Sequence, residues 1–143
     1  MDPSTTVALK NDLAELERLS GAIEQFGKRH GLPTAVLFDL HLALDEILTN
    51  VVAYAYDDRD EHEIIVRLGC AGDGNAQRIE VEVEDDGRPF NPLEAAPPDV
   101  HAPIEDRPIG GLGIYLVRRV MDDLEYRRQA DRNVLVLRKT VIA

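Results

Sequence analysis

The chain has 143 residues, 44% of them hydrophobic and 30% charged, which predicts a single globular domain over residues 1–143 with a real hydrophobic core. No run approaches the ~20 apolar residues that cross a membrane, the N-terminus lacks an export signal, and one cysteine makes no internal disulfide, so we predict a cytoplasmic protein without a membrane partner. The formal net charge of −11 is concentrated in residues 1–106, where 23 Asp and Glu stand against 8 Lys and Arg, and this acidity argues against direct nucleic-acid binding.

The first predicted elements are a short strand and an amphipathic helix. Residues 5–9 contain Thr and Val between turn-forming neighbours, which indicates a strand whose exposed edge is free to pair with another chain. Asn11 or Asp12 is expected to cap the helix that follows, with Asp12 and Glu15 at capping-box spacing. Apolar residues then recur at steps of three and four until Gly31, where we expect the helix to end.

The second helix contains the most informative stretch. We predict that it has Pro33 in its first turn and runs to about Tyr56, apolar nearly all round. Glu46 and Asn50 lie four residues apart, so their side chains project from the same face one turn apart. An unpaired buried polar group costs about 1–3 kcal/mol. The pair therefore either lies at an exposed edge and meets water, or binds a hydrated metal ion or a polar ligand.

A hairpin and a long irregular segment follow. Residues 63–70 and 77–84 flank the turn sequence GDGN and predict two strands. In the second of these strands Ile and Val alternate with Glu, so one face should be buried and the other wet and acidic. Over residues 85–113 prolines, glycines and acidic residues replace any regular pattern, which is typical of a functional lid or a disordered segment.

The remaining residues predict a helix and two closing strands. The helix covers residues 114–121, and the strands cover 124–129 and 133–142 around a short turn. The element order is therefore β-α-α-β-β-lid-α-β-β, with short turns between neighbouring strands. This order predicts an α/β (α+β) fold: a two-layer sandwich whose mostly antiparallel, mixed sheet is covered on one face by helices.

Three features along the chain have side chains suited to chemistry. The first is Glu46 and Asn50 on the second helix, the second is DDGRPF at residues 85–90 after a strand, and the third is GGLG at residues 110–113 before a helix. Each has an ordinary explanation as well. Two acidic residues and a glycine after a strand commonly form a turn, and a glycine-rich helix start can be a simple hinge.

Each feature also fits a part of a nucleotide site. Asp85 at a strand end can accept a hydrogen bond from an exocyclic amine of a base, while Gly87 lets the backbone approach the ring. Gly111 and Gly113 leave amide groups free for phosphate at a helix N-terminus. The glycines do not form a Walker loop, because no Lys-Ser/Thr follows, or a Rossmann turn, because they do not follow the first strand.

The polar pair on the second helix would complete such a site. Asn50 offers a carbonyl oxygen to Mg²⁺, a hard cation that takes its other ligands from water and phosphate. Glu46 is then placed to orient or deprotonate an attacking nucleophile. Any one of the three features is weak evidence by itself, but all three in this order around a lid-like segment favour a nucleotide-binding site that carries out chemistry.

In this order, Glu46-x-x-x-Asn50, Asp85-x-Gly87-x-Pro89-Phe90 and Gly111-x-Gly113 resemble the N-box and the two glycine boxes of the GHKL ATPases, the Bergerat-fold proteins. The similarity is greatest to the sequences of the small anti-sigma-factor serine kinases and extends over nearly the whole chain. The segments that carry it are DEILTNVVAYAY, VEDDGRPFNP and GGLGIYLVRRVMDDLEYRR. The resemblance implies a Bergerat ATP-binding fold that uses ATP and Mg²⁺.

The resemblance also implies a role for each residue of the boxes. Glu46 would be the general base, and residues 91–110 would form the ATP lid. The residues expected to bind the cofactors are Asn50 for the Mg²⁺ of Mg-ATP, Asp85 and Gly87 for adenine, and Gly111 and Gly113 for the phosphates. Two positions depart from the family pattern: Tyr54 stands where relatives commonly have His, and Pro89 stands where other branches have a second Gly.

The implied reaction is transfer of the γ-phosphoryl group to a serine or threonine of a small anti-anti-sigma (STAS-type) protein. The implied second activity is sequestration of a sigma factor, usually by a homodimer. An alternative is a nucleotide-gated module that holds a partner without phosphotransfer, and the presence of Glu46 favours the kinase over it.

A third possibility is a histidine-kinase fragment, which is less favoured. Such a protein should carry a dimerisation helix pair before this domain, whereas only about 30 residues precede the long helix. It should also phosphorylate itself on histidine. The four histidines, none in a recognisable phosphoacceptor context, are His30, His41, His62 and His101.

Overall fold

The structure, a computed structural model, describes residues 5–72, 75–94 and 111–142. The elements in chain order are β1 (Thr5–Lys10), the 3₁₀ turn η1 (Leu13–Glu15), α1 (Leu16–His30), α2 (Thr34–Tyr54), β2 (Glu63–Gly72), β3 (Ala76–Asp85), the 3₁₀ turn η2 (Pro92–Glu94), α3 (Gly111–Val120), β4 (Asp123–Gln129) and β5 (Arg132–Ile142). None of the helices in these ranges is long and apolar enough to cross a membrane.

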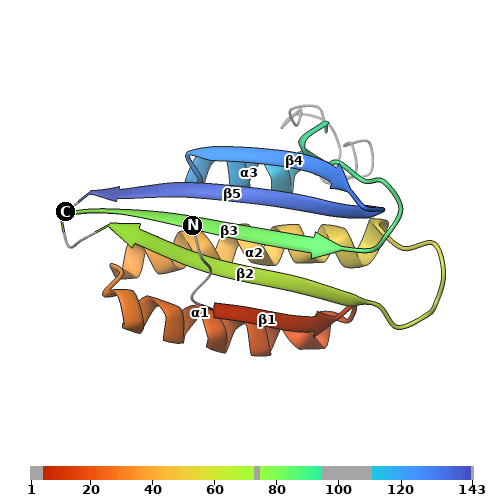
Figure 1. The fold of residues 1–143 in the computed structure, drawn as a ribbon, viewed down its shortest axis with the longest axis horizontal. Helices are drawn as coiled ribbons and strands as arrows, with labels where there is room; N and C mark the ends of the chain where they lie inside the picture. The colour runs from red at the N-terminus through yellow and green to blue at the C-terminus, as the bar shows by residue number, and fades with distance from the viewer. Residues whose placement is uncertain (1–4, 73–74, 95–110, 143) are drawn as a thin grey trace.

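The strands form one five-stranded sheet in the order β1-β2-β3-β5-β4, and all three helices lie against the same face of it (Figure 1). This arrangement confirms the predicted two-layer α+β sandwich. Every pairing between the described strands is antiparallel, so the parallel component of a mixed sheet is not seen among them. The reason is topological: each strand starts at the end of the sheet where its neighbour stops, so that the start of β2 at Glu63 pairs with the end of β1 at Lys10, and Asn133 of β5 pairs with Asp85 at the end of β3.

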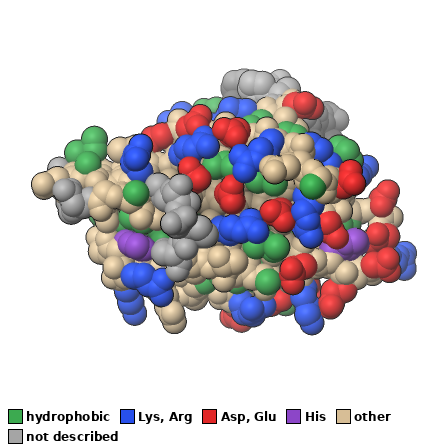
Figure 2. Space-filling view, viewed as in Figure 1, with side chains coloured by type: hydrophobic (Ala, Val, Ile, Leu, Met, Phe, Trp, Pro, Cys, Tyr) green, Lys and Arg blue, Asp and Glu red, His purple; other side chains and the backbone are tan. Residues whose placement is uncertain are grey.

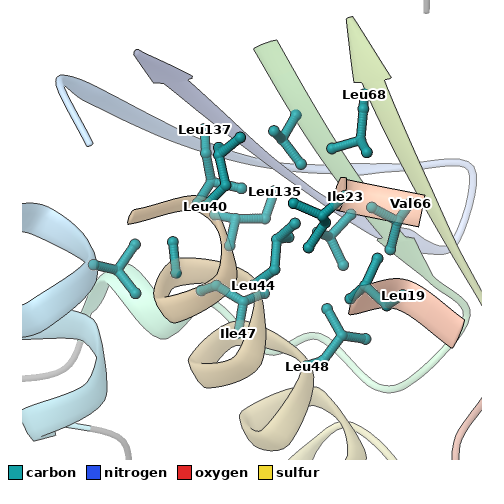
Figure 3. Close-up of a cluster of buried hydrophobic side chains, with 14 of the residues drawn as sticks. Leu19, Ile23, Leu40, Leu44, Ile47, Leu48, Val66, Leu68, Leu135 and Leu137 are labelled. Atoms are coloured by element: carbon teal, nitrogen blue, oxygen red, sulfur yellow. The ribbon is translucent and has the colours of Figure 1, made fainter. Parts of the chain in front are cut away.

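The core lies between the helices and the sheet (Figure 3). Leu19 and Ile23 of α1 point toward the sheet, and four leucine and isoleucine side chains of α2 lie beside them. The labelled core side chains are Leu19, Ile23, Leu40, Leu44, Ile47, Leu48, Val66, Leu68, Leu135 and Leu137. Burying each such side chain contributes about 1.5–3 kcal/mol, so this layer holds α2 firmly and fixes the side chains that α2 carries.

Alternation along β3 sets which side chains face the helices. Ile79, Val81 and Val83 are buried on the helix side, as the sequence predicted. The same alternation places Asp85 on the helix side, at the end of the strand. The opposite face of the sheet therefore carries the glutamates of β3, and we call it the open face.

Arginines from three neighbouring strands neutralise those glutamates. The ion pairs join Arg67 to Glu82 and Glu84, Arg127 to Glu82 and Glu125, Arg132 to Glu84, and Arg138 to Glu80, Asp123 and Glu125. Figure 2 shows Lys, Arg, Asp and Glu side chains interspersed over this face. Val134 and Val136 are 5% and 1% exposed between these strands although they lie outside the main core, because long charged side chains cover them. The open face is thus charged but internally paired.

Strand β1 lies at one edge of the sheet, as expected, but two of its outward groups are already bonded. The side chain of Arg18 donates to the Ala8 carbonyl at 3.2 Å, and the Lys10 amide donates to Glu15 at 3.0 Å. Arg18 and Glu15 also pair with each other at 3.1 Å. We call these two side chains the edge clamp.

The edge clamp replaces the predicted capping box. Asp12 does cap the first turn, accepting from the Ala14 amide at 3.0 Å. The Glu15 side chain, however, bonds the Lys10 amide instead of the Asp12 amide. The helix therefore starts as the short turn η1 and becomes α1 only at Leu16.

Two helix boundaries differ from the sequence expectation, whereas the end of α1 agrees with it. Helix α1 ends at Gly31 in the left-handed conformation, as predicted, with φ 62°. Helix α2 ends at Tyr54 rather than near Tyr56, because the Ala55 carbonyl bonds the loop after β3. Helix α3 begins at Gly111 rather than residue 114, since glycine lowers helix propensity without forbidding a first turn.

Candidate functional site

Helices α2 and α3 bring the first and third sequence features together. A Cβ atom added at Gly113, in the first turn of α3, would lie 2.5 Å from Oε2 of Glu46 and 3.6 Å from Nδ2 of Asn50. Real Cβ atoms do not approach that closely, so a side chain at this position would displace the carboxylate of Glu46, and glycine lets the polar pair lie directly beside the start of α3. The predicted juxtaposition of Glu46, Asn50 and Gly113 is therefore present in the fold.

Asn50 is poorly satisfied by the protein around it. Its side chain is only 7% exposed, and its Nδ2 is fully buried with no hydrogen-bond partner among the described residues. Leaving a buried donor unpaired costs about 1–3 kcal/mol. A bound phosphate oxygen or an ordered water would supply the missing acceptor, and the carbonyl end of the same amide would remain for a cation.

The donor set around Asn50 fits Mg²⁺ only if a ligand brings most of the oxygens. No group of three or more His, Cys, Asp or Glu side chains that could hold a metal is found in the part of the chain that the structure describes. Magnesium commonly keeps several waters and binds substrate phosphates, with one or two protein ligands. Asn50 fits such a site as a single protein ligand, and a metal bound by the protein alone is not indicated.

The N-terminus of α3 adds anion-binding groups to the same place. The helix starts at Gly111, so the amides of residues 111–113 have no partners within the helix. These amides, together with the positive end of the helix dipole, favour a phosphate group. Because Gly113 lies beside Glu46 and Asn50, phosphate and cation groups of one ligand can be bound here together.

Asp85 is a buried carboxylate with one oxygen left over. It is 3% exposed, and its Oδ1 accepts from the Gly87 amide and from Asn133 Nδ2, both at 2.9 Å. No described residue donates to Oδ2. Burial raises the pKa of Asp85 and the charge of Asp86 raises it further, whereas the two hydrogen bonds and Arg128 oppose the rise.

The loop that carries Asp85 is fixed to the C-terminal end of α2. The Arg88 amide donates to the Ala55 carbonyl at 2.8 Å, and its side chain donates to the Tyr54 carbonyl at 2.8 Å. A Cβ atom on Gly87 would lie 2.4 Å from the same Ala55 oxygen, so a side chain there would separate the loop from the helix. These contacts set the first glycine box against the helix that carries the N-box pair.

The unusual Tyr54 takes part in this contact through its backbone and its ring. Its ring lies edge-on to Phe90, with centroids 6.1 Å apart and an interplanar angle of 63°. The ring therefore packs against the glycine-box loop, in the edge-to-face geometry that aromatic pairs prefer.

Asn133, at the start of β5, was missed by the sequence interpretation. It is 3% exposed and donates to Asp85 and to the Arg88 carbonyl, at 2.9 and 2.8 Å. Its Oδ1 accepts from Tyr126, Arg128 and the Phe90 amide. The available signal was one polar residue opening the apolar run NVLVL, on the same face as two core leucines.

The beginning of the predicted lid, residues 91–110, is anchored to α3. Asn91 caps the short turn η2, accepting from the Leu93 amide at 2.9 Å. Arg118 of α3 donates to the Leu93 carbonyl, also at 2.9 Å. The rest of the predicted lid, residues 95–110, lies outside the described residues, so the lid assignment stays a prediction.

Comparison with known proteins gives a family match over most of the chain. The sequence profile described as "Histidine kinase-like ATPase domain" matches residues 9–139. Curated relatives named "Serine-protein kinase RsbW" are 34% identical in Bacillus mycoides (strain KBAB4) and 35% identical in Bacillus cereus (strain AH187), each over 102 residues. These alignments cover 68% of this chain and 61% of each relative, so the chain spans less than two thirds of their length.

Among the solved structures that match this chain, two illustrate the shared fold. The crystal structure of the RsbU and RsbW domains of Rv1364c from Mycobacterium tuberculosis superposes with a TM-score of 0.64, at 15% identity, over 99% of this chain and 34% of that one. The histidine kinase domain from Erythrobacter litoralis EL346 gives a TM-score of 0.52, at 22% identity, over 89% and 59%. At these identities the likeness concerns the fold alone.

Proposed function

The chain belongs to the family of histidine kinase-like ATPase domains, the GHKL type, and on this premise we propose that it is an ATP-dependent protein serine/threonine kinase acting as an anti-sigma factor. Membership implies use of ATP. The observation that carries the proposal is the meeting of Glu46 and Asn50 with Gly113, at the start of α3. The names of the RsbW relatives support the kinase class.

In this proposal adenine binds at Asp85. The free Oδ2 accepts a hydrogen bond from the exocyclic amine, while Asn133 and the Gly87 amide hold Oδ1 and fix the direction of the carboxylate. Because the group is buried, its hydrogen bond to the base forms in a low-dielectric setting and discriminates strongly against bases that lack the amine.

The phosphates then lie at the other end of the site. The free amides of α3 and the unpartnered Nδ2 of Asn50 donate to phosphate oxygens. Asn50 Oδ1 is the protein ligand for Mg²⁺, which would neutralise charge on the phosphates when bound. No further protein ligand for the cation is needed.

Glu46 would act on the acceptor hydroxyl. The oxygen of a serine or threonine on the partner forms a bond to the γ-phosphorus, the bond from that phosphorus to the β,γ-bridging oxygen breaks, and the hydroxyl proton moves to Glu46. ADP leaves with the bridging oxygen. The partner we propose is a small anti-anti-sigma protein of the STAS type, and the second activity is sequestration of a sigma factor by a homodimer.

The test compares nucleotide binding with phosphoryl transfer in the same variants. Purified protein is titrated with ATP, with and without Mg²⁺, and incubated with γ-labelled ATP and its cognate STAS-type partner. We expect Asp85→Asn to abolish binding, Asn50→Ala to remove the Mg²⁺ dependence, and Glu46→Ala to bind ATP but lose phosphoryl transfer by about 100-fold or more.

Each outcome separates the candidate functions. Nucleotide-dependent partner binding with no phosphate transferred, and with Glu46→Ala indistinguishable from wild type, would indicate a nucleotide-gated binding module instead of a kinase. Absence of ATP binding by the wild type under every condition would refute both. Phosphate appearing on a histidine of the chain itself would indicate the histidine-kinase alternative.

A further inference from the structure

A histidine lies between two carboxylates beside the candidate adenine loop. His62, which directly precedes β2, has Nε2 2.7 Å from Asp58 Oδ1 and Nδ1 3.1 Å from Asp86 Oδ1. Its ring stacks on Tyr56 with centroids 4.4 Å apart and an interplanar angle of 18°. The side chain is 17% exposed, so it is held on all sides rather than free in solvent.

The geometry favours the doubly protonated ring. An ionised carboxylate only accepts hydrogen bonds, and a neutral imidazole has one N–H to donate. Two carboxylate oxygens at hydrogen-bond distance from the two nitrogens are both satisfied only by an imidazolium. In agreement, the hydrogen bond to Asp58 and then that to Asp86 raise the pKa of His62 above its usual value, against the opposing effect of burial.

The backbone of His62 is fixed as well. Its amide donates to Asn11 Oδ1 at 2.8 Å, and its carbonyl accepts from the Asn11 amide at 3.1 Å. Asn11 also donates to the Asp60 carbonyl at 3.2 Å. The backbone that carries the ring is therefore fixed, and a change in the charge of the ring acts on its two carboxylate partners, Asp58 and Asp86.

Asp86 connects this histidine to the nucleotide site. It is the neighbour of Asp85 in the chain, and its negative charge contributes to the raised pKa of Asp85. A positive charge on His62 compensates Asp86 and thereby favours the ionised form of Asp85, which is the form that accepts two hydrogen bonds and still has a free oxygen. Loss of that positive charge leaves two adjacent carboxylates with less compensation.

The other charged groups around His62 are accounted for. A cavity of about 270 Å³ on one side of it is lined by side chains of β1, η1, α1 and β2. There Lys10 pairs with Glu61 at 3.4 Å and Arg18 with Glu15 at 3.1 Å, and Glu63 lines the same cavity. On the stacked side the Tyr56 hydroxyl is buried with no hydrogen-bond partner among the described residues, and burial raises its pKa, as do the charges of Asp85, Asp86 and Asp58, against the opposing charge of Arg132. Among these groups the imidazole is the one whose ordinary titration range includes neutral pH.

We propose that His62 is a positioning residue for nucleotide binding, whose imidazolium bonds Asp86 and keeps the Asp85 loop ready for adenine. The proposal rests on the proposed function, because it assigns adenine to Asp85. It gives nucleotide affinity a dependence on pH: affinity is highest when His62 is protonated and falls as pH rises through its pKa.

The test is a comparison of ADP affinity across pH, without added Mg²⁺, for wild type and His62→Gln. Between about pH 6 and about pH 8.5, titration of the ADP phosphate affects both proteins equally and cancels in the ratio of their dissociation constants. We expect His62→Gln to bind about three- to fivefold more weakly at the acidic end, and the ratio to approach one at the alkaline end.

His41→Gln is the matched control. His41 also has a carboxylate partner, Glu24 at 3.3 Å, but this pair lies between α1 and α2, away from the Asp85 loop. The ratio of the ADP dissociation constant of His41→Gln to that of wild type should stay at one at every pH. Asp86→Asn is the second variant, in case His62→Gln does not fold; it should flatten the pH dependence, and the NMR titration of His62 should then move toward its usual pKa.

A ratio of the ADP dissociation constants of His62→Gln and wild type that differs from one but is the same at every pH would overturn the proposal, since a purely structural role of His62 predicts that result. A ratio of one throughout would overturn it too. In both cases binding of ADP by the wild type would still support the proposed nucleotide site, and only the role of His62 would be refuted. Failure of the wild type to bind ADP at any pH would refute the proposed function and this inference together.

Discussion

At the scale of single residues, a substitution at Gly113 should affect the candidate site much more than the stability of the fold. A Cβ atom there meets the end of the flexible Glu46 side chain, which can move, and not a backbone atom. We therefore expect Gly113→Ala to change the free energy of unfolding by less than about 1 kcal/mol while lowering the phosphoryl-transfer rate by about 10- to 100-fold. Urea denaturation and single-turnover transfer to the partner measure the two effects.

Gly21 provides the matched control for that substitution. It lies in α1, and a Cβ atom there meets nothing within 4 Å. Gly21→Ala should stabilise the protein by about 0.5–1 kcal/mol through helix propensity, with unchanged transfer. Equal transfer rates for Gly113→Ala and Gly21→Ala would show that the position of the Glu46 carboxylate beside Gly113 does not limit phosphoryl transfer.

Residues differ in how far their role can be predicted from the sequence. Glu46 and Asn50 were identifiable because a polar pair on an apolar helix is a local anomaly, visible within one turn. Asn133 was not, because its meaning depends on Asp85, 48 residues away, and on a strand register that the local pattern does not set. Arg18 was missed for the same reason: its partner, the Ala8 carbonyl, belongs to another element.

At the scale of secondary-structure elements, the β4–β5 hairpin has an unfavourable turn. Ala130 and Asp131 form it with φ values of 52° and 61°, where L-residues other than Asn, Asp and Gly are disfavoured. Ala130→Gly should relieve this strain and raise the free energy of unfolding by about 1 kcal/mol. Equilibrium urea denaturation checks it, with ADP affinity as a second readout that should not change.

A matched substitution tests the cause of that gain. Ala14→Gly, in η1, replaces the same side chain where φ is not positive, and it should destabilise or leave the protein unchanged. Stabilisation by both substitutions would contradict the explanation from the positive φ of Ala130. The elements themselves followed from hydrophobic periodicity, whereas their ends depended on tertiary contacts such as that between Arg88 and Ala55.

At the scale of the whole molecule, the edge clamp determines how β1 meets other chains. Arg18 and Glu15 bond outward-facing backbone groups that a second strand would need. Any homodimer is therefore expected to use a surface other than an extension of the sheet at β1. The double variant Glu15→Ala/Arg18→Ala should self-associate more strongly than wild type, as measured by analytical ultracentrifugation over a concentration series.

The control for the edge clamp removes a salt bridge without uncovering backbone groups. Lys10→Ala breaks the exposed pair with Glu61, and its association state should match that of wild type. An unchanged sedimentation profile for the double variant would mean that the strand edge is protected by something other than these two side chains.

The paired charges of the open face have a practical consequence for attaching this protein to a sensor surface. Glu46, Asn50 and Asp85 lie on the helix side of the sheet, so a linker on the opposite side leaves them accessible to a partner in solution. Thr6, exposed on β1 and paired in register with Arg67, is a suitable position for an engineered thiol. The native Cys70 is half-buried and burial raises its pKa, so a thiol in place of Thr6 would react first and immobilise the molecule in one orientation.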